Sequence, residues 1–127
     1  METDMTIYLA GEDVDDASLF KDAVTSIFSD VNLVTSCKGE KLIKRLETDT
    51  DLPDIIFLDL NMPKRNGLEC LKKIKSNLSW KAIKTVVLST TLDDNEINRC
   101  YSLGADIFIT KPNSYSKLKV DLARCFL

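Results

Sequence analysis

Residues 54–63 read DIIFLDLNMP, a run of apolar residues that ends at Asp59 and is followed shortly by Pro63. An unbroken run of β-branched and aromatic residues is typical of a strand covered on both faces of a parallel sheet. A carboxylate that closes such a strand is poorly solvated unless it has a partner. We therefore predict a buried strand over 54–59, and Asp59 is the first candidate functional residue.

Runs of the same type recur along the chain and alternate with helical patterns. Further strands are predicted at 7–10, 31–35, 85–89 and 105–110, of which 31–35 is the weakest. The core-facing stripes of the predicted helices, with apolar residues three and four positions apart, are Leu19, Phe20, Ala23, Val24, Ile27 and Phe28; Leu42, Ile43 and Leu46; Leu68, Leu71 and Ile74; Ile97, Cys100, Tyr101 and Leu103; and Tyr115, Leu118, Leu122 and Cys125. Strict alternation of five strands and five helices predicts an α/β fold, a (βα)5 doubly wound sandwich with a five-stranded parallel sheet. For the strands we expect the flavodoxin-like order 2-1-3-4-5, one of the two common orders of doubly wound sheets.

Polar residues and a glycine mark where several predicted helices begin and end. Asp15 or Asp16, Asn66, Asp93 and Ser114 occupy N-cap positions, and Gly104 follows the fourth helix as a stop signal. Trp80, between the third helix and the fourth strand, is predicted to lie in the core.

The chain has 127 residues, 44% of them hydrophobic and 29% charged, which is typical of one globular domain. We predict a short tail over 1–4 and one domain over 5–127, in a stand-alone chain with no room for a second domain of ordinary size. The net charge of −3 provides no basic field for nucleic acid. The start lacks a signal peptide and no stretch is long enough to span a membrane, so the predicted location is cytoplasmic.

Histidine is absent, which excludes Ser/His/Asp and Cys/His catalysis and histidine-rich zinc sites. The four cysteines, Cys37, Cys70, Cys100 and Cys125, are widely spaced and are interpreted as reduced core thiols. Any chemistry must therefore rest on carboxylates, hydroxyls, lysine or isolated thiols.

In a doubly wound sheet, ligands bind beyond the carboxyl ends of the strands. The residues predicted at this edge are Glu12, Asp13, Asp59, Ser89 and Lys111. Crowded carboxylates repel one another unless a cation joins them, and an all-oxygen ligand set favours Mg²⁺. Together with Lys111, the metal would neutralise an incoming phosphoryl group, for which aspartate is a covalent acceptor. The hydroxyl of Ser89 could then move towards the phosphoryl group as a switch.

Five separated motifs resemble those of a known family. They are Leu58-Asp-Leu-Asn-Met-Pro63, Asn66-Gly67, Val87-Leu-Ser-Thr90, Gly104-Ala105 and Lys111-Pro112. Together with the order of the elements, they resemble the response-regulator receiver domain of two-component signalling, in its single-domain, chemotaxis-regulator-like form, over nearly the whole chain.

The resemblance implies that Asp59 accepts a phosphoryl group from a partner histidine kinase or histidine phosphotransfer protein. The chain would then be a signalling phosphoacceptor that catalyses its own phosphotransfer and dephosphorylation rather than an enzyme. Mg²⁺ would be bound by Asp59, Glu12 and the main-chain carbonyl of Asn61, and Asp13 could substitute if the loop shifts. The family usually has two adjacent acids after its first strand, whereas this chain has Gly11 before Glu12. We expect weaker Mg²⁺ binding for this reason.

The resemblance also implies a switch and two interaction surfaces. Ser89 would be the switch hydroxyl, Lys111 the cation that contacts phosphate, and Phe108 the aromatic that changes rotamer with the switch. The bond before Pro112 would be cis, which X-Pro bonds adopt at modest cost. A downstream target would read the fourth helix, fifth strand and fifth helix, and the kinase would dock on the first helix.

Three alternatives are weighed against this hypothesis. A receiver-like interaction module that no longer takes phosphate is motivated by Gly11. A haloacid-dehalogenase-type phosphatase also uses a strand-end aspartate, Mg²⁺ and a lysine, but the segment 59–61 lacks the second aspartate of its D-x-D motif. A flavodoxin-like electron carrier is disfavoured because the acidic segment 11–16 would repel the phosphate of FMN.

Overall fold

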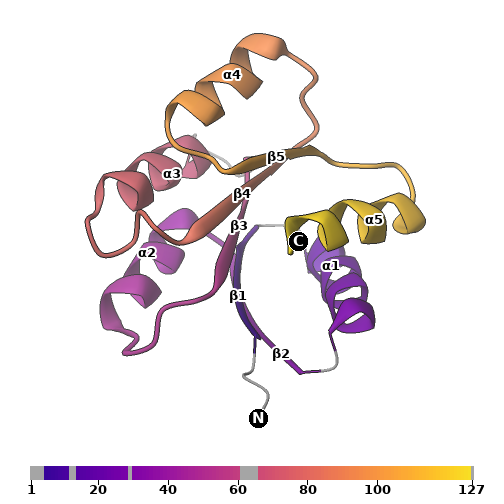
Figure 1. The fold of residues 1–127 in the computed structure, drawn as a ribbon, viewed down its shortest axis with the longest axis horizontal. Coiled ribbons are helices and arrows are strands. Elements are labelled where there is room, and N and C mark those ends of the chain that lie inside the picture. Colours follow the sequence, from indigo (N-terminus) through magenta and orange to yellow (C-terminus); the bar gives the residue numbers. More distant parts are fainter. Residues whose placement is uncertain (1–4, 12–13, 29, 61–65, 127) are drawn as a thin grey trace.

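Strands and helices alternate along the whole described part of the chain (Figure 1). The computed structural model describes residues 5–11, 14–28, 30–60 and 66–126, with only the backbone described at 14–17 and 66. The strands are β1 (Met5–Ala10), β2 (Val31–Ser36), β3 (Ile55–Asp59), β4 (Lys84–Ser89) and β5 (Ile107–Thr110). The helices are α1 (Val14–Ile27), α2 (Gly39–Thr48), α3 (Asn66–Ser76), α4 (Asp94–Ser102) and α5 (Tyr115–Cys125).

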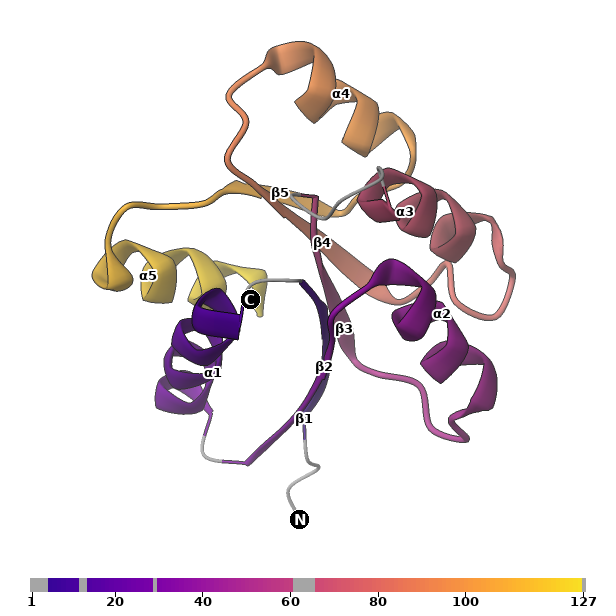
Figure 2. The ribbon, with the colours of Figure 1, turned by 180° about the vertical axis from the view of Figure 1, so that it is seen from behind.

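The five strands form one parallel sheet in the order β2-β1-β3-β4-β5. This confirms the predicted fold class and strand order. All residues of β3 are buried, because this strand lies in the middle of the sheet with helices over both faces (Figure 2). The apolar run that ends at Asp59 therefore forms the centre of the fold.

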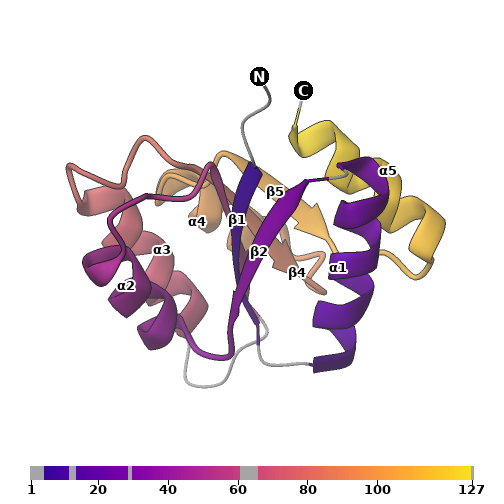
Figure 3. The ribbon, with the colours of Figure 1, turned by 90° about the horizontal axis from the view of Figure 1, so that it is seen from below.

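Helices cover both faces of the sheet, α1 and α5 on one side and α2, α3 and α4 on the other (Figure 3). Successive strand side chains point to opposite faces. In β1, Ile7 and Leu9 pack towards α1 and α5, whereas Tyr8 and Ala10 pack towards the other three helices. No helix within the described residues has the length and apolar character needed to cross a membrane.

Most of the predicted helix boundary signals are confirmed. Asp93 and Ser114 are N-caps of α4 and α5, and each side chain accepts a hydrogen bond from a backbone N–H of the first helical turn. Gly104 follows α4 with a φ of 109°, a conformation that L residues rarely adopt. The N-cap predicted at Asp15 or Asp16 was wrong, because α1 begins at Val14 and both residues lie inside its first turn. The N-cap predicted at Asn66 was also wrong, because Asn66 is already the first residue of α3.

The predicted burial was wrong at four side chains. Leu19, Tyr101 and Tyr115 are 49%, 46% and 41% exposed, because the spacing that predicts a helical stripe does not reveal how much of each helix face the sheet reaches. Cys37 is also exposed, whereas the other three cysteines are buried free thiols as predicted. Trp80 is buried, as expected.

Candidate functional site

Three of the predicted site residues meet at the carboxyl end of the sheet. Asp59 is the last residue of β3, Ser89 is the last residue of β4, and Lys111 directly follows β5. The parallel register sets Ser89 beside Thr110. The Lys111 N–H donates to the Ser89 carbonyl over 2.8 Å, which extends the ladder between β4 and β5. Strand pairing therefore brings residues from three strands to one place.

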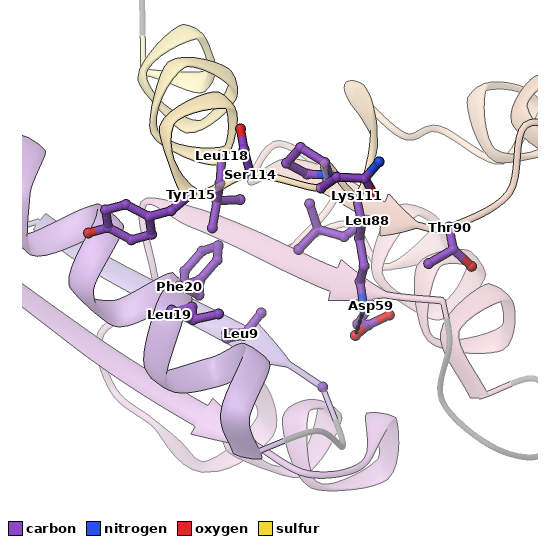
Figure 4. Close-up of a pocket in the computed structure, with 13 residues that line it drawn as sticks. Leu9, Leu19, Phe20, Asp59, Leu88, Thr90, Lys111, Ser114, Tyr115 and Leu118 are labelled. Carbon is purple, nitrogen blue, oxygen red and sulfur yellow. Dashed lines mark hydrogen bonds and ion pairs between the residues drawn. The ribbon is translucent and has the colours of Figure 1, made fainter.

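Asp59 and Lys111 form an ion pair at this edge. Lys111 Nζ lies 2.6 Å from Asp59 Oδ2, and the Lys111 and Asp59 side chains are 20% and 8% exposed. Burying a carboxylate at the end of an apolar strand costs free energy, which the ammonium offsets by attraction and a hydrogen bond. Figure 4 shows the long Lys111 side chain extending to Asp59. The pair places a cation directly against a buried carboxylate.

A cavity of about 350 Å³ opens beside this ion pair (Figure 4). Asp59 and Lys111 line its polar part, while Leu19 and Phe20 of α1 and Leu118 of α5 contribute to its apolar wall. Cavities of this kind, with apolar walls and a few convergent polar groups, are the usual sites of ligand binding and chemistry. Asp59 is thus enclosed by the sheet yet lines a space that an incoming group could enter.

Gly11 lies close to the Asp59 carboxylate. A Cβ atom at position 11 would lie 3.5 Å from Asp59 Cβ and 3.6 Å from Asp59 Oδ2, which is ordinary van der Waals contact. The space at this position therefore accepts a Cβ atom. An acid at position 11 would bring a second carboxylate next to Asp59, and the glycine of this chain brings none.

The hydroxyl of Ser89 is buried and faces the loop that follows β4. Ser89 is 4% exposed, and its Oγ accepts a hydrogen bond from the Thr91 N–H over 3.1 Å. The Thr91 hydroxyl in turn donates to Glu96 of α4 over 2.5 Å. The sequence prediction missed this link. The signal that could have indicated it is the spacing from Asp93 to Glu96, an N-cap followed three residues later by glutamate.

The remaining predicted metal ligands, Glu12, Asp13 and Asn61, lie outside the described residues. Asp59 is the one predicted ligand whose side chain the structure describes, and its carboxylate is the hard oxygen donor that Mg²⁺ prefers. Among the described residues, no group of three or more histidine, cysteine or acidic side chains could hold a metal ion. The Mg²⁺ site therefore stays a prediction.

The structure also bears on Pro112 and Phe108. The described residues contain no cis peptide bond, so the cis bond expected before Pro112 was wrong. The trans isomer is the intrinsically preferred form of X-Pro bonds, and a resemblance in sequence does not reverse that preference. Phe108 is half-buried and packs against the core on the side of α2, α3 and α4. Its role as a rotamer switch stays a prediction.

A parallel sheet with a buried lysine-paired aspartate at its carboxyl end defines a class of α/β protein, and the comparison with known families identifies it. Residues 14–123 match the response regulator receiver domain family. The chain belongs to this family. It is therefore a two-component response regulator receiver domain.

Individual relatives are similar over part or most of the chain. The probable methanogenesis regulatory protein FilR2 of Methanothrix harundinacea is 40% identical over 68 residues, which cover 54% of this chain and 44% of FilR2. Response regulator Rcp1 of Synechocystis sp. is 38% identical over 66 residues, 52% of this chain and 45% of Rcp1. The matched segments thus span less than half the length of these two curated relatives.

Solved structures match the fold over nearly all of the chain. The phosphorylated cyanobacterial phytochrome response regulator RcpA has a TM-score of 0.87 and 31% identity, with 94% of this chain and 89% of RcpA covered. The Mn²⁺-bound form of Rcp1 has a TM-score of 0.83 and 27% identity, with 93% and 88% covered. Both are response regulators, in agreement with the family match.

Proposed function

We propose that this receiver domain accepts a phosphoryl group on Asp59 from a partner histidine kinase or histidine phosphotransfer protein, and that phosphorylation switches a protein-interaction surface. The observation that carries the proposal is the Asp59–Lys111 pair, held at the end of a central strand and lining a cavity. Such a site offers a nucleophile in Asp59, a cation in Lys111, and a cavity through which a phosphodonor can reach them. The phosphorylated form of RcpA is a structural neighbour at 31% identity, which supports the same reading.

In the proposed transfer, a carboxylate oxygen of Asp59 attacks the phosphorus of a phosphohistidine on the partner. The P–N bond breaks, the donor imidazole keeps the electron pair, and an acyl phosphate forms. Lys111 already contacts Asp59, so its ammonium can pass to a phosphoryl oxygen as negative charge arrives there. Hydrolysis of the acyl phosphate by water would return the carboxylate and end the signal.

A divalent metal fits the carboxylate character of the site. We propose that Asp59, Glu12 and the carbonyl of Asn61 hold Mg²⁺, with Asp13 as the substitute ligand. A bound Mg²⁺ would supply charge neutralisation for the phosphoryl oxygens. The Mn²⁺-bound form of Rcp1 supports a divalent metal in this family of folds. Because Gly11 brings no second acid to Asp59, we propose weaker metal binding than in receivers with two acids.

The proposed output begins at Ser89, whose hydroxyl would rotate to donate to a phosphoryl oxygen on Asp59. Phe108 would follow into the space that this movement opens. The surface of α4, β5 and α5 would then present a changed face to a downstream protein, and α1 would receive the kinase. The population of the active form would rise because the phosphoryl group binds it better than the resting form.

The test compares the wild type with Asp59→Asn after incubation with Mg²⁺ and acetyl phosphate, by intact mass. We expect one phosphate on the wild type and none on Asp59→Asn. Asp106→Asn is the matched control, because Asp106 also pairs with a lysine, Lys75, at 2.9 Å, and it should be labelled like the wild type. If Asp59→Asn gains as much phosphate as the wild type, the phosphate is on another residue and the proposal is wrong.

Gly11 supports a second candidate, a receiver-like module that signals without phosphate. Under this alternative, the wild type takes no label from acetyl phosphate or from a phosphorylated histidine phosphotransfer domain. The variant Gly11→Asp sharpens the choice, since a Cβ atom at position 11 makes only ordinary contact with Asp59. Labelling of Gly11→Asp alone would indicate that the chain has lost phosphotransfer through this one position.

A further inference from the structure

One residue, Thr91, connects the end of β4 to the first turn of α4. Its backbone N–H donates to Ser89 Oγ over 3.1 Å, and its carbonyl accepts from Thr110 Oγ1 over 3.4 Å. Its hydroxyl donates to Glu96 Oε2 over 2.5 Å and accepts from the Asp93 N–H over 3.1 Å. Every polar group of Thr91 is therefore engaged with a different neighbour.

The Glu96 contact departs from the usual arrangement at a helix start. In a capping box, a glutamate three residues after the N-cap accepts a hydrogen bond from the N-cap's own backbone N–H. Here the N-cap is Asp93, and its N–H donates to the Thr91 hydroxyl, which donates onward to Glu96. The hydroxyl of Thr91 is thus inserted into the capping box and ties the preceding loop to α4.

This tie fixes Ser89 in one orientation. An Oγ atom that accepts the Thr91 N–H is directed along the chain towards the loop, whereas a hydrogen bond to a phosphoryl group on Asp59 requires it to turn to the neighbouring strand. We infer that this turn breaks the hydrogen bond from Thr91, so that the resting and the phosphoryl-bound positions of the hydroxyl exclude one another. Contacts that hold Thr91 in place stabilise the resting arrangement.

We propose that Glu96 is a positioning residue that acts through the Thr91 hydroxyl to hold Ser89 in its resting orientation and thereby opposes phosphorylation. This inference rests on the proposed function of Asp59 as acceptor. Loss of the Glu96 contact removes a stabilising interaction from the resting form only, so the equilibrium shifts towards the form that accepts phosphate. The charge of the carboxylate strengthens the hydrogen bond.

The experiment uses Glu96→Ala and Thr91→Val, which remove the acceptor and the donor of this hydrogen bond. Each should raise the rate of labelling by acetyl phosphate and Mg²⁺ about threefold to tenfold, the range that one exposed charge-assisted hydrogen bond supports. Each should also speed hydrogen exchange at the backbone amide of residue 91 without phosphodonor. The double variant should gain no more than Thr91→Val alone, because loss of the Thr91 hydroxyl already removes the contact with Glu96.

Three further variants separate positioning from a general effect on α4. Glu96→Gln keeps an acceptor and Thr91→Ser keeps the hydroxyl, so both should restore labelling to within about twofold of the wild type. Asp94 is an exposed acid in the same first turn of α4 as Glu96. Asp94→Ala should leave both the labelling rate and the hydrogen exchange at residue 91 unchanged. Acceleration by Asp94→Ala equal to that by Glu96→Ala would overturn the proposal, because charge alone would then explain the effect.

The exchange measurement keeps this inference distinct from the proposed function. If the wild type takes no phosphate, the proposed acceptor role fails, and the Thr91 amide still decides whether Glu96 positions the loop. If the wild type is labelled but Glu96→Ala and Thr91→Val change neither rate nor exchange, the acceptor role stands and the positioning role of Glu96 is wrong.

Discussion

Two lysine–aspartate pairs lie at opposite ends of the sheet, and their surroundings differ. At the carboxyl end, Lys111 contacts Asp59 at 2.6 Å and both line a cavity. At the amino end, Lys75 contacts Asp106 at 2.9 Å beside the start of β4 and β5. The residue types and the distances are nearly the same, so the pair alone does not distinguish a reactive site from a structural one.

The difference lies in the neighbours of each pair. Lys75 Nζ also donates to the carbonyls of Lys81 and Ile83, so all three of its N–H bonds are used. Asp106 Oδ2 accepts a further bond from the Thr85 N–H. The amino-end pair thus joins loop and strand backbones into a closed network. The carboxyl-end pair faces a space that a donor group can enter, which suits it to chemistry.

The strongest test of this contrast exchanges each lysine for methionine, which keeps the apolar stem and removes the charge. We expect Lys111→Met to slow labelling by acetyl phosphate about 100-fold, the effect of removing one preorganised cation or donor from a transition state. Lys75→Met should label within about twofold of the wild type. Time courses of intact mass measure both labelling rates. Equal rates in the two variants would contradict the claim that only the carboxyl-end pair takes part in phosphotransfer.

For stability we expect the opposite ranking of the two ends, with the larger loss at the amino-end pair. Lys75→Met should lower the free energy of unfolding by about 2 kcal/mol, because two carbonyls and a carboxylate lose their donor at a side chain that is 10% exposed. Urea denaturation measures this. Lys72→Met, an exposed position on α3, is the control and should change stability by less than about 0.5 kcal/mol. A wild-type midpoint for Lys75→Met would contradict the structural role.

Gly104 tests how closely the amino-end network is packed. A Cβ atom at this position would lie 2.7 Å from Lys75 Cγ, and the backbone φ is 109°. Gly104→Ala should lower the free energy of unfolding by about 1–2 kcal/mol, from backbone strain and the displacement of Lys75. Thermal and urea denaturation measure the loss, with Asn98→Ala on an exposed position of α4 as the control. No loss in Gly104→Ala would contradict both the backbone strain and the close contact with Lys75.

The Tyr8 phenol provides a pH test of a contact far from both pairs, with Asp49, the C-cap residue after α2. Burial, together with a hydrogen bond from the phenol to the Asp49 carboxylate, raises the pKa of Tyr8 from 10.0 to about 12. The folded protein therefore holds the phenol proton to higher pH than the unfolded chain does. This contribution to stability is full below pH 10 and is lost as pH rises towards 12.

By about pH 11, the wild type should have lost about 1 kcal/mol more stability than Tyr8→Phe has. Urea denaturation across alkaline pH measures the two slopes. Tyr8→Phe carries no titrating group at this position and is its own control. Parallel slopes would show that the Tyr8 phenol ionises as readily in the folded chain as in the unfolded one.

Much of the fold follows from local patterns in the sequence. The run before Asp59 has the composition of a strand covered on both faces, and β3 is buried along its whole length. Capping residues Asp93 and Ser114 form bonds within one turn of the chain, so their role is visible from neighbours alone. Leu19 was misplaced because periodicity gives the direction of a side chain but not what lies opposite it.

The sequence by itself determined the alternation of elements, the parallel sheet with right-handed connections, and the strand-end positions of Asp59, Ser89 and Lys111. Only the tertiary structure decided that Lys111 contacts Asp59. The link from Ser89 through Thr91 to Glu96 and the trans bond before Pro112 are local, but they depend on loop conformations that strand and helix patterns do not encode. Strand patterns depend on short-range composition, whereas a hydrogen bond or ion pair across 52 residues depends on distances that the whole packed chain sets.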